Sequence, residues 1–273
     1  MRIHGIFVLL LLFSACSDFG RIQRKGTFEE KYSAAEKYFQ EKNYYRAGYL
    51  FEDIIAYSAG RPEAKEIHLM NAYCNYYEGS LVYASDGFRR FYEKYPRSEK
   101  VEDAMFMYAK TLYALSPEIE LDQTNTFKAM NALQRFLNQY PDTENKKECS
   151  EKIESLIKKL ENKAYRIAKL NYKIEHYRAA VLSFTDFVLD YPSSEYNEEL
   201  NFLKLKAQRF FAKRSVERLV KNGKTHYLKK DRLNDGKTFY YDFVRKYPNS
   251  GYLQEAEQLF KQIETELENI QNK

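Results

Sequence analysis

One phrase recurs along this chain: a phenylalanine, three residues, Tyr-Pro, one residue and a hydroxyl side chain. Its four copies span Phe91–Ser98, Phe136–Thr143, Phe187–Ser194 and Phe243–Ser250. Upstream of each proline, a small residue, a large apolar residue and the phenylalanine follow at spacings of four and then three, which places them on one helical face. The proline ends the helix, and the hydroxyl is suited to cap the next one. The phrase therefore predicts a repeated helix end.

The small residues that begin this pattern define a structural repeat. They are Ala84, Ala129, Ala180 and Gly236, and Ala47 begins a fifth copy in which Tyr57-Ser58 replaces Tyr-Pro. This pattern is typical of the second helix of a tetratricopeptide repeat (TPR). A further small residue lies twelve positions earlier in three copies, at Ala35, Ala72 and Ala168, as the first helix requires. In the third repeat we take Ala109 as its equivalent.

The predicted fold class is therefore all-α: a tetratricopeptide-repeat superhelix, or α-solenoid, of about five helix pairs plus a C-terminal helix. The repeats are expected over residues 28–60, 62–97, 99–142, 144–193 and 195–249, with the last helix over 250–271. The first helix of the fifth repeat is expected to run to residue 222, and no segment alternates clearly enough to predict a strand.

The N-terminus has the pattern of a targeting signal. Arg2 precedes an apolar run, Ile6–Phe13, which is too short to span a bilayer. The following Ser14, Ala15 and Cys16 resemble the lipobox of bacterial lipoproteins, in which the cysteine becomes the acylated first residue. We therefore expect a signal peptide over residues 1–15, lipidation at Cys16 and a linker over 16–27. The alternative is an ordinary secretory signal with a chance cysteine. The absence of aspartate after Cys16 favours the outer membrane, by the same resemblance.

The composition argues against several classes of function. Lys and Arg total 44 against 39 Asp and Glu, a balance that gives no support for nucleic-acid binding. There is no Trp, which argues mildly against a sugar-capturing protein. Cys74 and Cys149 lie on different predicted helices; they are expected to be small buried residues, with a disulfide as the alternative.

We find no sequence support for catalysis or for a cofactor. Besides His4, the histidines are His68, His176 and His226, and none has metal-ligand spacing with another His or Cys. There is no G-x-S-x-G motif and no glycine-rich phosphate loop. We therefore predict no catalytic residue, no metal site and no cofactor.

Aromatic residues are frequent at positions expected to line the concave groove of the solenoid. These candidate groove residues are Tyr32, Phe39, Leu69, Tyr73, Tyr76, Tyr77, Phe106 and Tyr113. They suggest an apolar slot, with hydroxyls, for an extended or helical peptide. The alternative is that the long helices bury these rings against each other.

A basic stretch lies near the C-terminal end of the repeats. The candidate docking residues are Lys213, Arg214, Arg218 and Lys221. They could bind an acidic partner domain or anionic lipid, or they could form a solvated helix face with a loop.

The combination of a lipobox and five repeats resembles the BamD family of lipoproteins in the machine that inserts β-barrels into bacterial outer membranes. Two stretches add to the resemblance: Asp122–Thr124 in a loop of the third repeat, and Leu160–Ser194 across the fourth. It implies a non-enzymatic protein held by acyl chains on the periplasmic face of the outer membrane. It further implies that the N-terminal repeats receive unfolded outer-membrane proteins and that the C-terminal repeats hold the BamA-like barrel subunit.

Two other readings remain open from the sequence. One is another periplasmic TPR adaptor, similar to the cell-envelope coordinator CpoB, which shares the Tyr-Pro-x-Ser phrase but usually begins with a coiled coil. The other is a glycan-binding nutrient lipoprotein, a class that is longer and rich in Trp.

Overall fold

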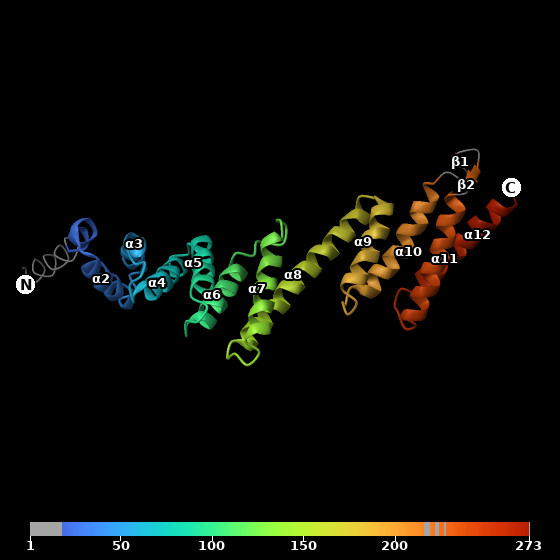
Figure 1. The fold of residues 1–273 in the computed structure, drawn as a ribbon. Helices are drawn as coiled ribbons and strands as arrows, with labels where there is room; N and C mark the ends of the chain where they lie inside the picture. Colours follow the sequence, from blue (N-terminus) through green and yellow to red (C-terminus); the bar gives the residue numbers. More distant parts are fainter. Residues whose placement is uncertain (1–17, 216–218, 222–223, 227, 273) are drawn as a thin grey trace, which may run out of the picture. The chain divides into compact units, whose positions relative to one another are not determined.

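The computed structural model describes residues 18–215, 219–221, 224–226 and 228–272, and these are mostly helical (Figure 1). Residues 18–25 form a first helical segment. The elements after it are α2 (Phe28–Gln40), α3 (Tyr44–Ile55), α4 (Ala64–Tyr77), α5 (Leu81–Lys94), α6 (Val101–Ala114), α7 (Thr124–Gln139), α8 (Lys146–Lys173), α9 (Tyr177–Asp190), α10 (Asn197–Lys213), β1 (Leu219–Lys221), β2 (Lys224–His226), α11 (Leu228–Lys246) and α12 (Leu253–Gln271). The chain divides into two compact units, Met1–Leu156 and Ile157–Lys273, with the division inside α8.

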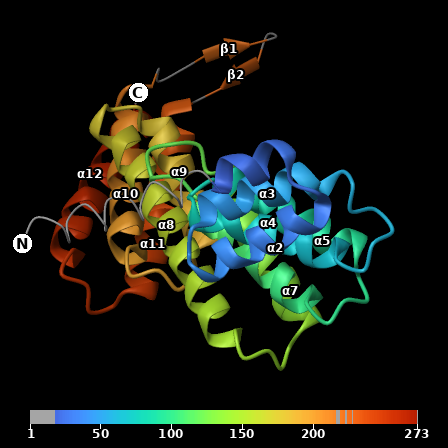
Figure 2. The same ribbon diagram turned by 90° about the vertical axis from the view of Figure 1, so that its left-hand side faces the viewer.

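The helices of the first unit form the expected consecutive pairs, and Figure 2 shows α2 to α5 packed together. The start of α2 is fixed by a capping box at Thr27: its hydroxyl accepts from the N–H of Glu30 at 3.2 Å, and the Glu30 carboxylate accepts from the N–H of Thr27 at 2.9 Å. This arrangement satisfies two backbone donors that a helix start otherwise leaves unpaired.

The face predicted from the repeat pattern is the buried face of each second helix. Ala47, Ala84 and Ala129 are completely buried, and the large partners that follow them, such as Phe51 and Phe88, are buried too. In the second unit, Ala180 and Gly236 hold the same positions and are also buried. The all-α tetratricopeptide solenoid is therefore confirmed, with five helix pairs followed by α12 in the part of the chain that is described.

The hydroxyl of the repeated phrase has a role different from the one expected. Ser98, Ser194 and Ser250 do not cap the next helix; each accepts from the backbone N–H two residues further on, at 3.0–3.3 Å. The N-cap positions are taken by Lys100, Tyr196 and Tyr252, whose side chains make no cap hydrogen bond. The hydroxyl therefore stabilises the turn after the proline rather than the helix that follows.

The expected helix over residues 195–222 was wrong in about its last third. Helix α10 ends at Lys213, and the chain then forms a two-stranded antiparallel hairpin, in which Leu219 pairs with His226 and Lys221 with Lys224. The hairpin extends away from α10 and α11, the helices that it connects (Figure 2). The expectation of no strand was therefore also wrong. Helix α11 begins at Leu228.

Candidate peptide-binding surface of the N-terminal unit

Five aromatic rings meet where α2, α3 and α4 come together, and we call them the aromatic cluster: Phe39, Tyr44, Tyr73, Tyr76 and Tyr77. The rings of Tyr44 and Tyr77 are stacked with centroids 4.4 Å apart, and Phe39 lies 5.4 Å from Tyr44. Tyr73 and Tyr76 lie 6.1 and 5.6 Å from Tyr77. Four of these five residues were predicted as groove residues; Tyr44 was not.

Within the cluster, Tyr73 is anchored and Tyr77 is open. The Tyr73 ring packs edge-on against Phe88 at 5.0 Å, and its hydroxyl donates to Asp103 at 2.5 Å. Burial, together with the hydrogen bond to the Asp103 carboxylate, holds the pKa of the Tyr73 phenol far above its ordinary value. Tyr77, by contrast, is 50% exposed. Tyr73 therefore packs against the core, whereas Tyr77 leaves half of its surface to solvent.

The other predicted groove residues are divided between the core and its edge. Leu69 and Phe106 are buried in the hydrophobic core, so they cannot line an open groove, and the prediction is corrected for both. Tyr32 is half-buried, edge-on to Phe51. Tyr113 is half-buried; its hydroxyl accepts from Ser155 at 3.1 Å, and the ammonium of Lys152 lies 4.4 Å from its ring centre.

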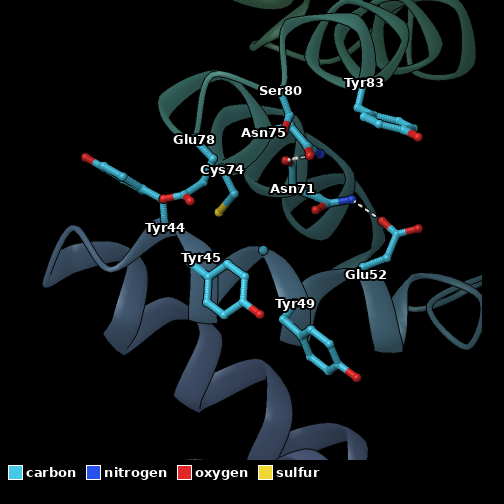
Figure 3. A pocket seen from close by; sticks show the side chains of 11 residues that line it. Tyr44, Tyr45, Tyr49, Glu52, Asn71, Cys74, Asn75, Glu78, Ser80 and Tyr83 are labelled. Carbon is cyan, nitrogen blue, oxygen red and sulfur yellow. Dashed lines mark hydrogen bonds between the residues drawn. The ribbon is translucent and has the colours of Figure 1, made fainter.

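A hollow of about 450 Å³ lies next to the aromatic cluster, between α3, α4 and the start of α5. We call it the tyrosine hollow. Its lining includes Tyr44, Tyr45, Tyr49 and Tyr83, and Figure 3 shows these side chains around the polar groups of α4. Tyr83 and Tyr45 are 74% and 66% exposed. Large exposed rings at the border of a concave surface are typical of binding sites for other molecules.

The local sequence explains why the hollow is open. The core face of α3 carries Ala47, Phe51 and Ile54, so Tyr45 and Tyr49 point away from the core. Between them Gly48 has no side chain, and α4 comes so close that a Cβ at this position would lie 3.0 Å from the Cβ of Cys74. The glycine therefore brings two helices together at the floor while the tyrosines stand at the border.

The polar lining of the hollow is rich in hydrogen-bond acceptors. The side-chain amide of Asn71 donates to the Glu52 carboxylate at 2.5 Å, and that of Asn75 donates to the backbone carbonyl of Asn71 at 3.0 Å. Glu78 contributes a second carboxylate, and no Lys or Arg of the described residues belongs to the lining. Sequence reasoning missed this site because it examined only the first helix of each repeat; the signal was the run of tyrosines opposite the core face of α3.

The structure describes only part of the basic stretch, and Arg214 in that part is already paired within the chain. Arg214 donates to the backbone carbonyl of Glu175 at 3.1 Å, pairs with the Glu175 carboxylate, and lies 4.7 Å from the ring centre of Tyr177. Lys213 is exposed at the end of α10. Arg218 lies outside the described residues, and Lys221 belongs to β1.

No group of three or more His, Cys, Asp or Glu side chains that could hold a metal occurs among the residues described. Cys74 and Cys149 are both buried and unbridged, as expected. Cys16 lies outside the described range. Within that range no helix combines the length and the apolarity that crossing a membrane requires.

The repeated helix pairs define a helical-repeat protein of the TPR class, with a tyrosine-lined hollow on its N-terminal unit. Comparison with known proteins gives the family. The chain belongs to the outer membrane lipoprotein family YfiO, whose model matches residues 24–222.

Two named relatives agree with this family. The outer membrane protein assembly factor BamD of Rickettsia prowazekii (strain Madrid E) is 23% identical over 159 residues, which span 58% of this chain and 63% of that protein. The "Putative outer membrane protein assembly factor BamD" of Aquifex aeolicus (strain VF5) is 28% identical over 210 residues, which span 75% of this chain and 67% of that protein. Among solved structures, the TPR domain of P58(IPK) has a TM-score of 0.40 and 16% identity, covering 90% of this chain and 65% of that one.

Proposed function

We propose that this protein is a non-enzymatic scaffold lipoprotein of the outer-membrane β-barrel assembly machinery. The observation that carries the proposal is the match of one family model to residues 24–222, which includes both the tyrosine hollow and the aromatic cluster. The names of the two relatives, both assembly factors, support the same role. The protein would act by binding other chains and holding them, without chemical change.

In this function the N-terminal unit receives extended segments of unfolded outer-membrane proteins. The support is geometric: Tyr45 and Tyr83 line the tyrosine hollow with more than half of their surface exposed, and Tyr77 in the neighbouring aromatic cluster is half exposed. Tyrosine offers a large apolar ring at low cost in conformational entropy, together with a hydroxyl that can meet a peptide backbone. The second unit would hold the barrel-forming subunit, an assignment that rests on the family resemblance alone.

Membrane attachment is proposed through acyl chains on Cys16. Each buried CH₂ contributes about 0.8 kcal/mol, so several chains hold a protein on a bilayer with great stability. Because the helical segment at residues 18–25 leads within a few residues to α2, the repeats would lie close to the periplasmic face of the outer membrane.

The decisive experiment is copurification from detergent-extracted membranes, with mass spectrometry of the recovered chains. We expect the barrel-forming subunit of the assembly machinery in stoichiometric amount. Recovery of envelope-division proteins instead would favour the adaptor alternative, and recovery of a nutrient transporter would favour the glycan-binding alternative; either result would contradict the proposal.

The anchor is tested separately by metabolic labelling with a palmitate analogue. We expect label on the unaltered chain, none on Cys16→Ser, and a shift of Cys16→Ser from the membrane to the soluble periplasmic fraction. The matched control is Ser17→Ala, which leaves the acylated residue in place and should be labelled normally. Equal labelling of Cys16→Ser would contradict lipidation at this residue.

A further inference from the structure

We propose that the tyrosine hollow binds the side chain of an arginine in an extended segment of another protein. This inference rests on the proposed function, in which the N-terminal unit receives segments of other chains. It adds that the tyrosine hollow would select segments that contain an arginine.

The first argument is the excess of acceptors in the hollow. Glu52 and Glu78 form none of the salt bridges of the described residues, and the side-chain carbonyl of Asn75 accepts no hydrogen bond there. The guanidinium group of arginine is the matching ligand, because it carries five N–H donors in a fixed plane and no acceptor. A neutral or acidic segment would bring no positively charged donor to these two carboxylates.

The second argument is that none of the described Lys or Arg residues lines the hollow. Arg46, the arginine of α3, points elsewhere: its guanidinium lies 5.1 Å from the ring centre of Phe19 and 5.5 Å from that of Tyr38. The two carboxylates of the lining therefore attract a positive charge from outside, in a partly enclosed space where charge pairing is stronger than on an open surface.

The third argument is the arrangement of the rings. Tyr45 and Tyr83 stand on opposite helices around the polar groups of α4, as Figure 3 shows, and most of each side chain is exposed. A guanidinium stacks on a tyrosine face through cation–π and planar contacts, whereas the compact, strongly hydrated ammonium of lysine does so less well. Rings on two sides and acceptors at the floor together favour arginine over lysine.

The size of the hollow agrees with a side chain carried on a peptide. A volume of about 450 Å³ lies toward the lower end of the range for small-ligand sites, roughly 300–1,000 Å³. It holds one long side chain with part of its backbone and leaves the neighbouring residues of the segment outside, near the aromatic cluster.

The inference is tested by NMR titration of the isotope-labelled protein with a short capped glycine–serine peptide that contains one central arginine. A second peptide carries citrulline, which has the same shape without the charge, and a third carries lysine. We expect shifts at the residues that line the hollow, affinity lower by about tenfold for citrulline, and intermediate affinity for lysine.

Variants of the protein complete the test. The double variant Glu52→Gln with Glu78→Gln should weaken arginine-peptide binding by about tenfold, and Tyr83→Ala by a few-fold. Glu154→Gln, an exposed carboxylate of α8, is the matched control and should leave binding unchanged. Far-UV circular dichroism checks that each variant is folded.

Equal affinities for the arginine and citrulline peptides, or no shifts in the hollow up to the solubility limit of the peptide, would overturn the inference. That failure is distinct from failure of the proposed function. An unfolded outer-membrane segment could still shift the aromatic cluster, and the barrel subunit could still copurify, although the hollow had no preference for arginine.

Discussion

Gly87 of α5 faces Ala72 of α4 at a distance that leaves no room for another carbon: a Cβ at position 87 would lie 2.8 Å from the Cβ of Ala72. Ala72 is the small residue of the first helix in the second repeat, and Gly87 lies opposite it on the second helix. The repeat therefore depends on one pair of small residues where its two helices are in close contact.

We expect Gly87→Ala to lower the free energy of unfolding by about 1–2 kcal/mol, because overpacking outweighs the gain in helix propensity. Combining it with Ala72→Gly should recover most of the loss, since the swap restores the original volume. Urea denaturation measures the free energy of unfolding of the single and the double variant. Gly20→Ala is the control: its new Cβ would meet only the far end of the Arg24 side chain, at 3.8 Å, so stability should stay the same or rise. Additive effects at positions 72 and 87 would contradict the close contact.

Tyr73 and Tyr77 lie one helical turn apart, yet their substitutions should behave differently. Tyr73→Ala removes a ring packed on Phe88 and the hydrogen bond to Asp103, so we expect a loss of about 3 kcal/mol. Tyr77→Ala removes a half-exposed ring stacked on Tyr44 and should cost about 1 kcal/mol or less. Thermal unfolding of the two alanine variants measures this difference in stability.

Binding of an unfolded outer-membrane segment gives the second readout for this pair. Tyr77→Ala should weaken binding while the fold persists. Tyr73→Phe keeps the ring and loses only the hydroxyl, so it shows whether any effect of Tyr73→Ala on binding comes from unfolding. Equal stability losses for the two alanine variants would refute the distinction between anchor and open ring.

The repeat pattern predicted the fold well because it records packing that every repeat must satisfy. Ala47, Phe51 and Ile54 are buried as their spacing requires, and the same is true of the later copies except at Tyr240, which is partly buried. The two groove residues that failed show the limit of the method. Leu69 and Phe106 occupy positions on a first helix where exposure depends on how closely the neighbouring helices approach, and spacing along one helix does not contain that distance.

The hollow was missed for a related reason. Its floor exists because Gly48 lets α3 approach Cys74 on α4, and its border comes from residues of three helices. No single helical period brings such residues together. The hairpin after α10 was missed because its two strands are only three residues long and lie within a stretch rich in Lys and Arg that was interpreted as a helix face with a loop.

The buried cysteines should be unreactive in the folded protein. Burial raises the pKa of the Cys74 thiol to about 12 and that of Cys149 to about 11, so at about pH 8 the thiolate is scarce as well as inaccessible. In a Cys16→Ser chain we expect no labelling by iodoacetamide over a time that labels both thiols fully in urea, as measured by intact mass. Fast labelling of Cys74 without denaturant would show that α3 and α4 separate readily.

A pair between α8 and α10 should make the stability of the second unit depend on pH. The Glu199 carboxylate accepts from Lys169 at 2.8 Å and from the Tyr165 hydroxyl at 2.7 Å. Burial alone would raise the pKa of Glu199, but the hydrogen bonds from Lys169 and Tyr165 outweigh it and lower this pKa below 4.5. The ionised form is therefore favoured by folding, and its stabilisation is present above the unfolded pKa and is lost as the pH falls through the folded one.

We therefore expect Glu199→Gln to lower the free energy of unfolding by about 1 kcal/mol at about pH 6.5 and to have much less effect at about pH 3. Urea denaturation of both proteins at the two pH values measures the difference, in which the protonation of all other carboxylates cancels. Glu154→Gln, exposed in α8, is the control and should be neutral at both pH values. The difference in stability between the unaltered protein and Glu199→Gln could instead grow toward acid pH. That result would mean that burial destabilises the ionised Glu199 more than the contacts with Lys169 and Tyr165 stabilise it.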